Sequence, residues 1–245
     1  MEFTRIYDQV GAYALMSKAK ARKLYEFVLR EKPRCVFEMG AHRGGSALIM
    51  AAALQELGTG TVTTFDFQDI HGLAPNIESL INRSHLHKFI SVVCSDWCYE
   101  WELGKLLESR RTPRNRIIPF VDFAYIDGGH YWTSTGFTFY LITKLLRPGG
   151  WLLLDDLDWM IEKHESTGNS YARRISTEAK RRPMVRMVFD LLVRTSNSYH
   201  NCRIAANGSW GWAQKKDGPG NPPTPKRGSG NHQHRTARRT LSERC

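Results

Sequence analysis

The chain has 245 residues, 41% of them hydrophobic, which fits one α/β domain with extensions better than two domains. No apolar run reaches the roughly 18–20 residues of a membrane span, and the N-terminus lacks the apolar core and cleavage site of a secretory signal peptide. The formal net charge is +11, but residues 215–245 hold eight Lys/Arg and two Asp/Glu and so carry +6 of it, which weakens the case for a nucleic-acid-binding domain.

Hydrophobic periodicity predicts alternating helices and strands over most of the chain. The first predicted helix covers 18–31, where Leu24, Phe27 and Val28 form an apolar stripe opposite basic residues. Apolar runs predict strands over 35–40, 61–67, 90–96, 121–127 and 151–156. Helical patterns lie between them, over 44–57, 76–88, 99–111 and 133–146. This alternation predicts an α/β fold of βαβ units with a parallel sheet.

The pattern is less regular after the fifth strand. Residues 157–183 show no clear period, and 184–195 is predicted to be a helix. Two short apolar runs, 202–206 and 209–214, flank Asn207-Gly208, a pair that is typical of a two-residue hairpin turn. We therefore expect an antiparallel hairpin at the end of the domain.

Composition divides the chain into an N-terminal helical segment (1–32), a main domain (33–214) and a basic tail (215–245). The tail holds four Gly and four Pro and almost no aliphatic residues, so we expect it to be disordered. Two interpretations of the tail stay open: a solvated segment without a partner, or weak contact with RNA or anionic surfaces. Five scattered cysteines indicate buried thiols in a reducing compartment, so we expect a cytoplasmic protein.

Three aspartates lie where two predicted strands end: Asp127 after the fourth strand, and the pair Asp155 and Asp156 after the fifth. If these strands are neighbours, about 4.8 Å apart, the three carboxylates converge and repel one another unless a cation or protons intervene. Clustered oxygen ligands favour a hard divalent metal. The alternative is that these aspartates are helix caps and solvated strand ends.

The loop that joins the first strand to its helix has the pattern G-x-x-x-G-G. Glycines let the backbone approach a ligand, and the helix N-terminus offers free N–H groups, although an ordinary tight turn has the same residues. The spacing is not the G-x-G-x-x-G of dinucleotide-binding loops. Glu38, two residues before Gly40, favours a ligand with an ammonium or sulfonium group over a pyrophosphate.

Polar residues also end the next two predicted strands. Asp66 ends the second strand, 26 residues after Gly40, where an acid can accept hydrogen bonds from ribose hydroxyl groups. Ser95 and Asp96 end the third strand, where they could bind an adenine amino group. Together with these residues, the glycine loop is better explained as part of a ligand site than as an ordinary tight turn.

Together, the segments FEMGAHRGGS, TFDF and YIDGGHYW…LLRPGGWLLLDDLDW resemble class I S-adenosylmethionine-dependent methyltransferases. The likeness covers about residues 20–214 and is greatest to metal-dependent O-methyltransferases of the macrocin and mycinamicin type, with catechol O-methyltransferase more distant. It implies a Rossmann-like, doubly wound, mostly parallel seven-stranded sheet with a C-terminal antiparallel hairpin.

The resemblance implies S-adenosylmethionine and Mg²⁺ as cofactors. The implied acceptor is a hydroxyl group on a sugar, polyketide or catechol-like small molecule, and homo-oligomers are common in such families. Asp66 would hold the ribose, and Ser95 and Asp96 would flank the adenine. The residues implied around the methionine part of the cofactor are Glu38, Gly40, Ala41, His42 and Ser46.

The resemblance also assigns the acidic residues. Asp127, Asp155 and Asp156 match the metal-ligand positions of the family. His130, three residues after the first of them, matches the position of the general base.

One departure concerns the base. Many such enzymes read D-G-D-H, whereas residues 127–130 here read D-G-G-H, with Gly129 in place of the second acid. Either His130 takes the proton alone, or the chain binds the cofactor without methyl transfer, like cephalosporin hydroxylase-like proteins. A nucleic-acid methyltransferase is the other alternative, favoured by the basic stretches Arg110–Arg116 and Arg173–Arg186.

Overall fold

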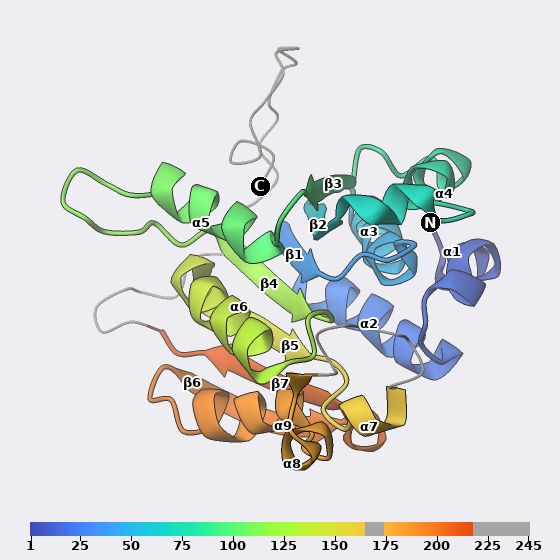
Figure 1. Ribbon diagram of the computed structural model, residues 1–245. Coiled ribbons are helices and arrows are strands. Elements are labelled where there is room, and N and C mark those ends of the chain that lie inside the picture. Colours follow the sequence, from blue (N-terminus) through green and yellow to red (C-terminus); the bar gives the residue numbers. More distant parts are fainter. Residues whose placement is uncertain (165–173, 218–245) are drawn as a thin grey trace.

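Seven strands form one mixed sheet in the computed structural model, which describes residues 1–164 and 174–217 (Figure 1). Their order across the sheet is β3-β2-β1-β4-β5-β7-β6. The strands β1 to β5 are parallel, and β7 is antiparallel to both β5 and β6. The strands are β1 (Cys35–Met39), β2 (Thr61–Phe67), β3 (Ile90–Ser95), β4 (Val121–Ile126), β5 (Leu146–Leu154), β6 (Tyr199–Ala205) and β7 (Trp210–Lys215).

The chain changes direction across the sheet between β1 and β4. From β1 it proceeds outward through β2 to β3, and then returns to place β4 on the free side of β1. The register aligns Met39 of β1 with Phe65 of β2 and with Ile126 of β4, so the carboxyl ends of these strands meet at one edge. Such a switch point is where open α/β sheets bind their ligands.

Helices cover both faces of the sheet, as Figure 1 shows. Their alternation with the parallel strands follows from the right-handed crossovers of βαβ units. The helices are α1 (Phe3–Val10), α2 (Lys18–Glu31), α3 (Gly45–Leu57), α4 (Ile77–Ser84), α5 (Tyr99–Ser109), α6 (Trp132–Leu145), α7 (Ile161–His164), α8 (Thr177–Lys180) and α9 (Met184–Val188), which continues as a π-helix over Phe189–Val193.

Two hydrophobic cores lie on the two faces. The first contains the apolar sides of α1 to α4, with α3 buried almost all round. The second contains the apolar sides of α5, α6 and α9. Val36 of β1 joins the first core and Phe37 the second, because successive strand side chains point to opposite faces.

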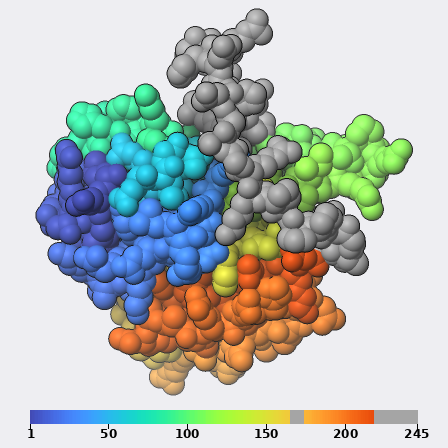
Figure 2. Space-filling model, turned by 180° about the vertical axis from the view of Figure 1, so that it is seen from behind, coloured from blue at the N-terminus to red at the C-terminus, as the bar shows by residue number. Residues whose placement is uncertain are grey.

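The N-terminal helices share the first core with the C-terminal hairpin. The ring of Phe27 on α2 lies 4.3 Å from that of Trp212 on β7 and 4.7 Å from that of Phe123 on β4, measured between centroids. In the rear view of Figure 2, the blue N-terminal part borders the orange C-terminal part. Residues 1–32 therefore help to cover the sheet.

The sequence predicts the sheet correctly and misplaces some boundaries. The mostly parallel seven-stranded sheet with an antiparallel C-terminal hairpin is confirmed. Helix α1 is not predicted, and α4 ends at Ser84 because His85 adopts a left-handed conformation. The strand β5 begins at Leu146, the last residue of the predicted helix, and includes the predicted turn at 147–150, because Leu146 already pairs with Val121 ahead of a register shift.

Other expectations meet mixed outcomes. No helix among the described residues has the length and hydropathy that crossing a bilayer requires. Cys94, Cys98 and Cys202 are free thiols, but Cys35 is disulfide-bonded, so the expectation of five free thiols is wrong there. Residue 215 of the predicted tail ends β7, and residues 218–245 lie outside the described part of the chain.

Candidate active site

A cavity of about 290 Å³, called the strand-end cavity below, opens at the carboxyl ends of β1, β2, β4 and β5. It lies at the switch point between β1 and β4, where the topology predicts a ligand site. Its size is close to the lower end of ordinary small-molecule pockets. Nine of the predicted site residues line it: Gly40, Ala41, His42, Ser46, Asp66, Asp127, His130, Asp155 and Asp156.

The loop after β1 touches the loop after β4. Gly40 has a φ of 100°, and a Cβ atom built there would overlap the carbonyl oxygen of Asp127. The Gly40 N–H donates to the carbonyl of Phe65, 2.9 Å away, which ties the loop to the end of β2 as well. Glycine is required at position 40 because of both the left-handed backbone and the close approach.

Asp66 organises the same loop from the end of β2. Its Oδ2 accepts a hydrogen bond from the N–H of His42 at 2.6 Å, and its Oδ1 accepts one from the N–H of Phe67 at 2.8 Å. Each carboxylate oxygen retains a lone pair for a further donor. Asp66 can therefore hold the loop and bind a ligand hydroxyl group in the cavity.

Glu38 lies beneath the loop and does not line the cavity. Its side chain is completely buried, and Oε2 accepts a hydrogen bond from the Thr64 hydroxyl at 2.5 Å. Burial raises the pKa of Glu38 to about 7, and the hydroxyl groups of Ser46 and Thr64 lower it by less. This arrangement differs from the expected direct contact with a cationic ligand.

Ser95 and Asp96 are not brought to the cavity lining. The Ser95 side chain is buried, and its hydroxyl donates to Glu102 Oε1 at 3.3 Å, while Asp96 is exposed. Ser95 is the last residue of β3 and Asp96 follows it, and β3 is the edge strand two positions away from β1. Their predicted contact with an adenine therefore has no counterpart in the shape of this cavity.

The N-terminal segment covers one side of the cavity, although the sequence does not predict which of its residues do so. Tyr13, Ala14 and Leu15 line it. A Cβ atom built on Gly45 would overlap the backbone of Ala14. Leu15 has a φ of 47° and is 77% exposed. The Gly44–Gly45 pair was a sign of close backbone approach, but nothing in the sequence identified the approaching segment.

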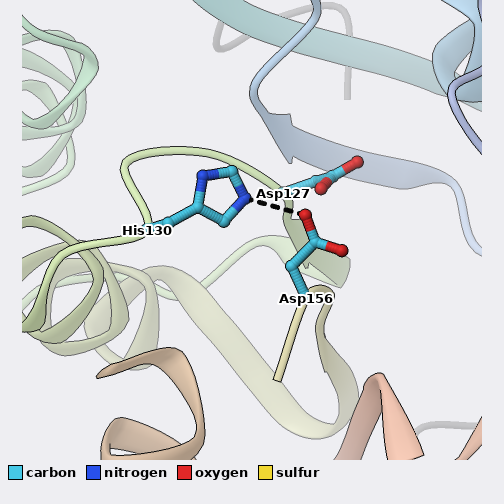
Figure 3. Close-up of side chains that lie close together, drawn as sticks. All are labelled: Asp127, His130 and Asp156. Carbon is cyan, nitrogen blue, oxygen red and sulfur yellow. Dashed lines mark ion pairs between the residues drawn. The ribbon is translucent and has the colours of Figure 1, made fainter. Parts of the chain in front are cut away.

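Three side chains that could bind a metal ion lie close together, as Figure 3 shows, and all three line the cavity. One ligand atom from each of Asp127, His130 and Asp156 lies within 4.8 Å of the other two. His130 Nε2 is 3.1 Å from Asp156 Oδ2. Burial and the nearby Asp155, Asp156 and Glu38 carboxylates raise the pKa of Asp127, whereas contact with His130 lowers that of Asp156.

Asp155, the third predicted metal ligand, is already bound by protein groups. Its Oδ1 accepts from Lys20 Nζ and from the Asp156 N–H, each at 2.7 Å, and its Oδ2 accepts from the Tyr125 hydroxyl at 2.6 Å. Lys20 lies on α2 and also stands over the Trp210 ring, 5.2 Å from its centroid. This contact is not predictable from local sequence patterns, because 135 residues separate Lys20 from Asp155.

His130 is held in a stack of rings. Its imidazole lies 5.0 Å from the Trp159 ring at an interplanar angle of 22°. Trp159 in turn stacks on His164 at 5.2 Å and 5°. This packing, together with Asp156, restricts the orientation of the imidazole at the cavity.

Gly129, where an acid stands in many similar enzymes, has no room for a side chain. Its φ is 63°, and a Cβ built there would overlap the Tyr99 hydroxyl and lie 2.9 Å from Ser134 Oγ. Tyr99 is the first residue of α5 and lines the cavity. The space that a side chain at position 129 would need is therefore occupied by the Tyr99 hydroxyl group.

Comparison with known proteins identifies the domain. Residues 37–157 match a family model described as a methyltransferase domain. The chain carries a methyltransferase domain. The matched region of this methyltransferase domain contains the loop after β1, Asp66, Tyr99 and the cluster of Asp127, His130 and Asp156. No curated protein sequence matches the chain.

Solved structures share the fold of this methyltransferase domain. The O-methyltransferase TomG from Streptomyces achromogenes, in complex with SAM, aligns with a TM-score of 0.59 and 16% identity, covering 88% of this chain and 91% of that one. An O-methyltransferase from Bacillus cereus in complex with SAH gives 0.59 and 19%, covering 87% and 90%. SAH-bound PaMTH1 from Podospora anserina gives 0.61 and 12%, covering 88% of both chains. At these identities the likeness establishes the fold.

Proposed function

We propose that this protein is an S-adenosylmethionine-dependent O-methyltransferase that acts on a hydroxyl group of a small molecule. The observation that carries the proposal is the strand-end cavity, in which the loop after β1, Asp66 and the cluster of Asp127, His130 and Asp156 face one space. The family match and the O-methyltransferases of the same fold support it. They do not favour a nucleic-acid methyltransferase or a cofactor-binding protein without methyl transfer.

The cofactor would lie along the carboxyl ends of β1, β2 and β4. Gly40, Ala41, His42 and Ser46 would line its methionine part, since all four line the cavity at the loop after β1 and the start of α3. Glu38 would support this loop from below. When bound, the cofactor supplies an electrophilic methyl group on a sulfonium.

The nucleoside part would lie toward β2 and β3. Asp66 would accept hydrogen bonds from the ribose hydroxyl groups, using lone pairs that the His42 and Phe67 N–H groups leave free. Ser95 and Asp96 remain the predicted adenine contacts, although reaching them would require the ligand to extend beyond the strand-end cavity.

The donor set at the cavity fits a divalent cation such as Mg²⁺. Asp127 and Asp156 offer carboxylate oxygens within 4.8 Å of each other. Burial, and then the neighbouring carboxylates, raise the pKa of Asp127, and a cation would neutralise the negative charge of that cluster. A bound cation would lower the pKa of an acceptor hydroxyl group. Asp155 would join the ligands only after losing its ion pair with Lys20.

His130 would take the proton of the acceptor hydroxyl group. Asp156 Oδ2 lies 3.1 Å from its Nε2, and stacking on Trp159 fixes the plane of the ring. Imidazole prefers transition metals to Mg²⁺, so a Mg²⁺ ion held by the two aspartates would leave His130 free for this role. With glycine at position 129 the second acid cannot act as the base, but His130 would still accept the proton.

A methyl-transfer assay tests the proposal. Purified protein is incubated with methyl-labelled S-adenosylmethionine and a panel of catechol, sugar and polyketide hydroxyl acceptors, with and without EDTA. We expect label transfer to at least one acceptor, lost with EDTA and reduced by about a hundredfold or more in His130→Gln. Unchanged turnover in EDTA together with normal activity of Asp156→Ala would contradict the metal role.

A further inference from the structure

The hydroxyl group of Tyr99 faces the strand-end cavity without a hydrogen-bond partner among the described residues. The side chain is only 3% exposed, and its position at the start of α5 directs it to the cavity wall. Burial, followed by the charges of Glu100, Asp66 and Asp127, raises the pKa of this phenol, so it remains a neutral donor. Buried tyrosine hydroxyl groups normally bond to a partner.

Two glycines leave this hydroxyl group open to the cavity. A Cβ at Gly128 would lie 3.1 Å from the Tyr99 oxygen, and a Cβ at Gly129 would overlap it. Side chains at either position would cover the hydroxyl group or displace it. The two glycines thus leave a polar group available at the wall of a ligand-sized space.

The position of Tyr99 indicates which part of a ligand it meets. On one side its ring lies 5.6 Å from that of Phe67, which follows Asp66 at the end of β2. On the other side its hydroxyl group lies at Gly128, in the loop after β4. In the cofactor placement proposed above the ribose lies at Asp66, so Tyr99, which contacts the adjacent Phe67, would stand beside the nucleoside part.

We propose that Tyr99 is a cofactor-binding residue whose hydroxyl group donates a hydrogen bond to an oxygen or nitrogen acceptor in the adenosine half of S-adenosylmethionine. The bond gives the buried hydroxyl group the partner that it lacks in the protein. It also gives the nucleoside part a contact within the cavity, whose lining does not include Ser95 and Asp96.

Calorimetric titration of Tyr99→Phe tests this role with two probes: S-adenosylhomocysteine, and 5′-methylthioadenosine, which lacks the amino-acid part. We expect the variant to bind both probes about threefold to tenfold more weakly than the wild type, as the loss of one hydrogen bond implies. The change removes one oxygen that bonds no described residue, so the fold is retained, which circular dichroism checks. Tyr199→Phe is the matched control, since that hydroxyl group lies 2.8 Å from Thr143 Oγ1, away from the cavity.

The outcomes separate this role from the proposed function. If the wild type binds neither probe, the proposed cofactor is wrong. If the wild type binds both and Tyr99→Phe binds them equally well, the role of Tyr99 is overturned and the proposed function stands. Weaker binding of S-adenosylhomocysteine alone would move the contact to the methionine half and overturn the assignment to the nucleoside.

Discussion

Replacing Glu38 with glutamine tests whether this buried carboxyl group is protonated in the folded protein. The side chain is fully buried under the loop after β1 and accepts a hydrogen bond from Thr64 at 2.5 Å. Burial raises its pKa from an ordinary 4.5 to about 7. Glutamine keeps the size and a hydrogen-bond acceptor but does not ionise.

The expected effect follows from the difference between the two pKa values. Because the folded state binds the proton more tightly, Glu38 contributes stability that is full below pH 4.5 and is lost as the pH rises through about 7. At about 1.4 kcal/mol per pH unit, the free energy of unfolding of the wild type should fall by roughly 2–3 kcal/mol relative to Glu38→Gln between about pH 5 and pH 8.

Urea denaturation followed by tryptophan fluorescence measures this difference at several pH values. Asp127, whose pKa is also raised, is present in both proteins, and Glu38 is the smallest of the causes that raise it, after burial, Asp155 and Asp156, so most of its own contribution cancels. Glu26→Gln, on the exposed face of α2, is the control and should show no such trend. A difference between wild type and Glu38→Gln that does not change with pH would refute the reasoning.

Three further substitutions test two contacts around the cavity and the end of helix α2. Lys20→Met should lower the free energy of unfolding, measured by urea titration, by about 3 kcal/mol, because it leaves Asp155 buried without its ammonium partner. Adding Asp155→Asn to this variant should restore much of the lost stability. Gly40→Ala should lower the free energy of unfolding by about 2 kcal/mol or more, because the added Cβ overlaps Asp127. The variant should also give no calorimetric signal with S-adenosylhomocysteine, and normal binding would contradict the importance of this loop contact. Lys32→Gly should raise stability by about 0.5–1 kcal/mol in thermal unfolding with unchanged binding, because Lys32 ends α2 at a φ of 51°; a lower melting temperature would refute this.

Local sequence patterns predict most of the central helices and strands, because each of these elements has a clear hydrophobic pattern of its own. The helix predicted over 18–31 is observed as Lys18–Glu31, with Ser17 capping it and Lys32 ending it. Predicted boundaries are wrong where a single backbone conformation ends a helix, as at His85, or where strand pairing extends into the end of a predicted helix, as at Leu146. These outcomes depend on tertiary contacts that the local sequence does not contain.

The candidate site was predictable to the extent that strand ends determine it. The rule that strand ends meet at one edge brings Asp66, Asp127 and Asp156 into one cavity. The same rule fails for Ser95, because β3 is an edge strand and its end lies away from the switch point. It also cannot foresee that α2 delivers Lys20 to Asp155, a contact between segments far apart in the sequence.

The central claim is that the strand-end cavity binds S-adenosylmethionine, and a calorimetric titration of the wild-type protein with S-adenosylhomocysteine tests it most directly. We predict a saturable heat signal for one ligand per chain, and its loss in Asp66→Ala, whose fold is checked by circular dichroism. The absence of a binding signal in a folded wild-type protein, or equal binding by Asp66→Ala, would contradict the account.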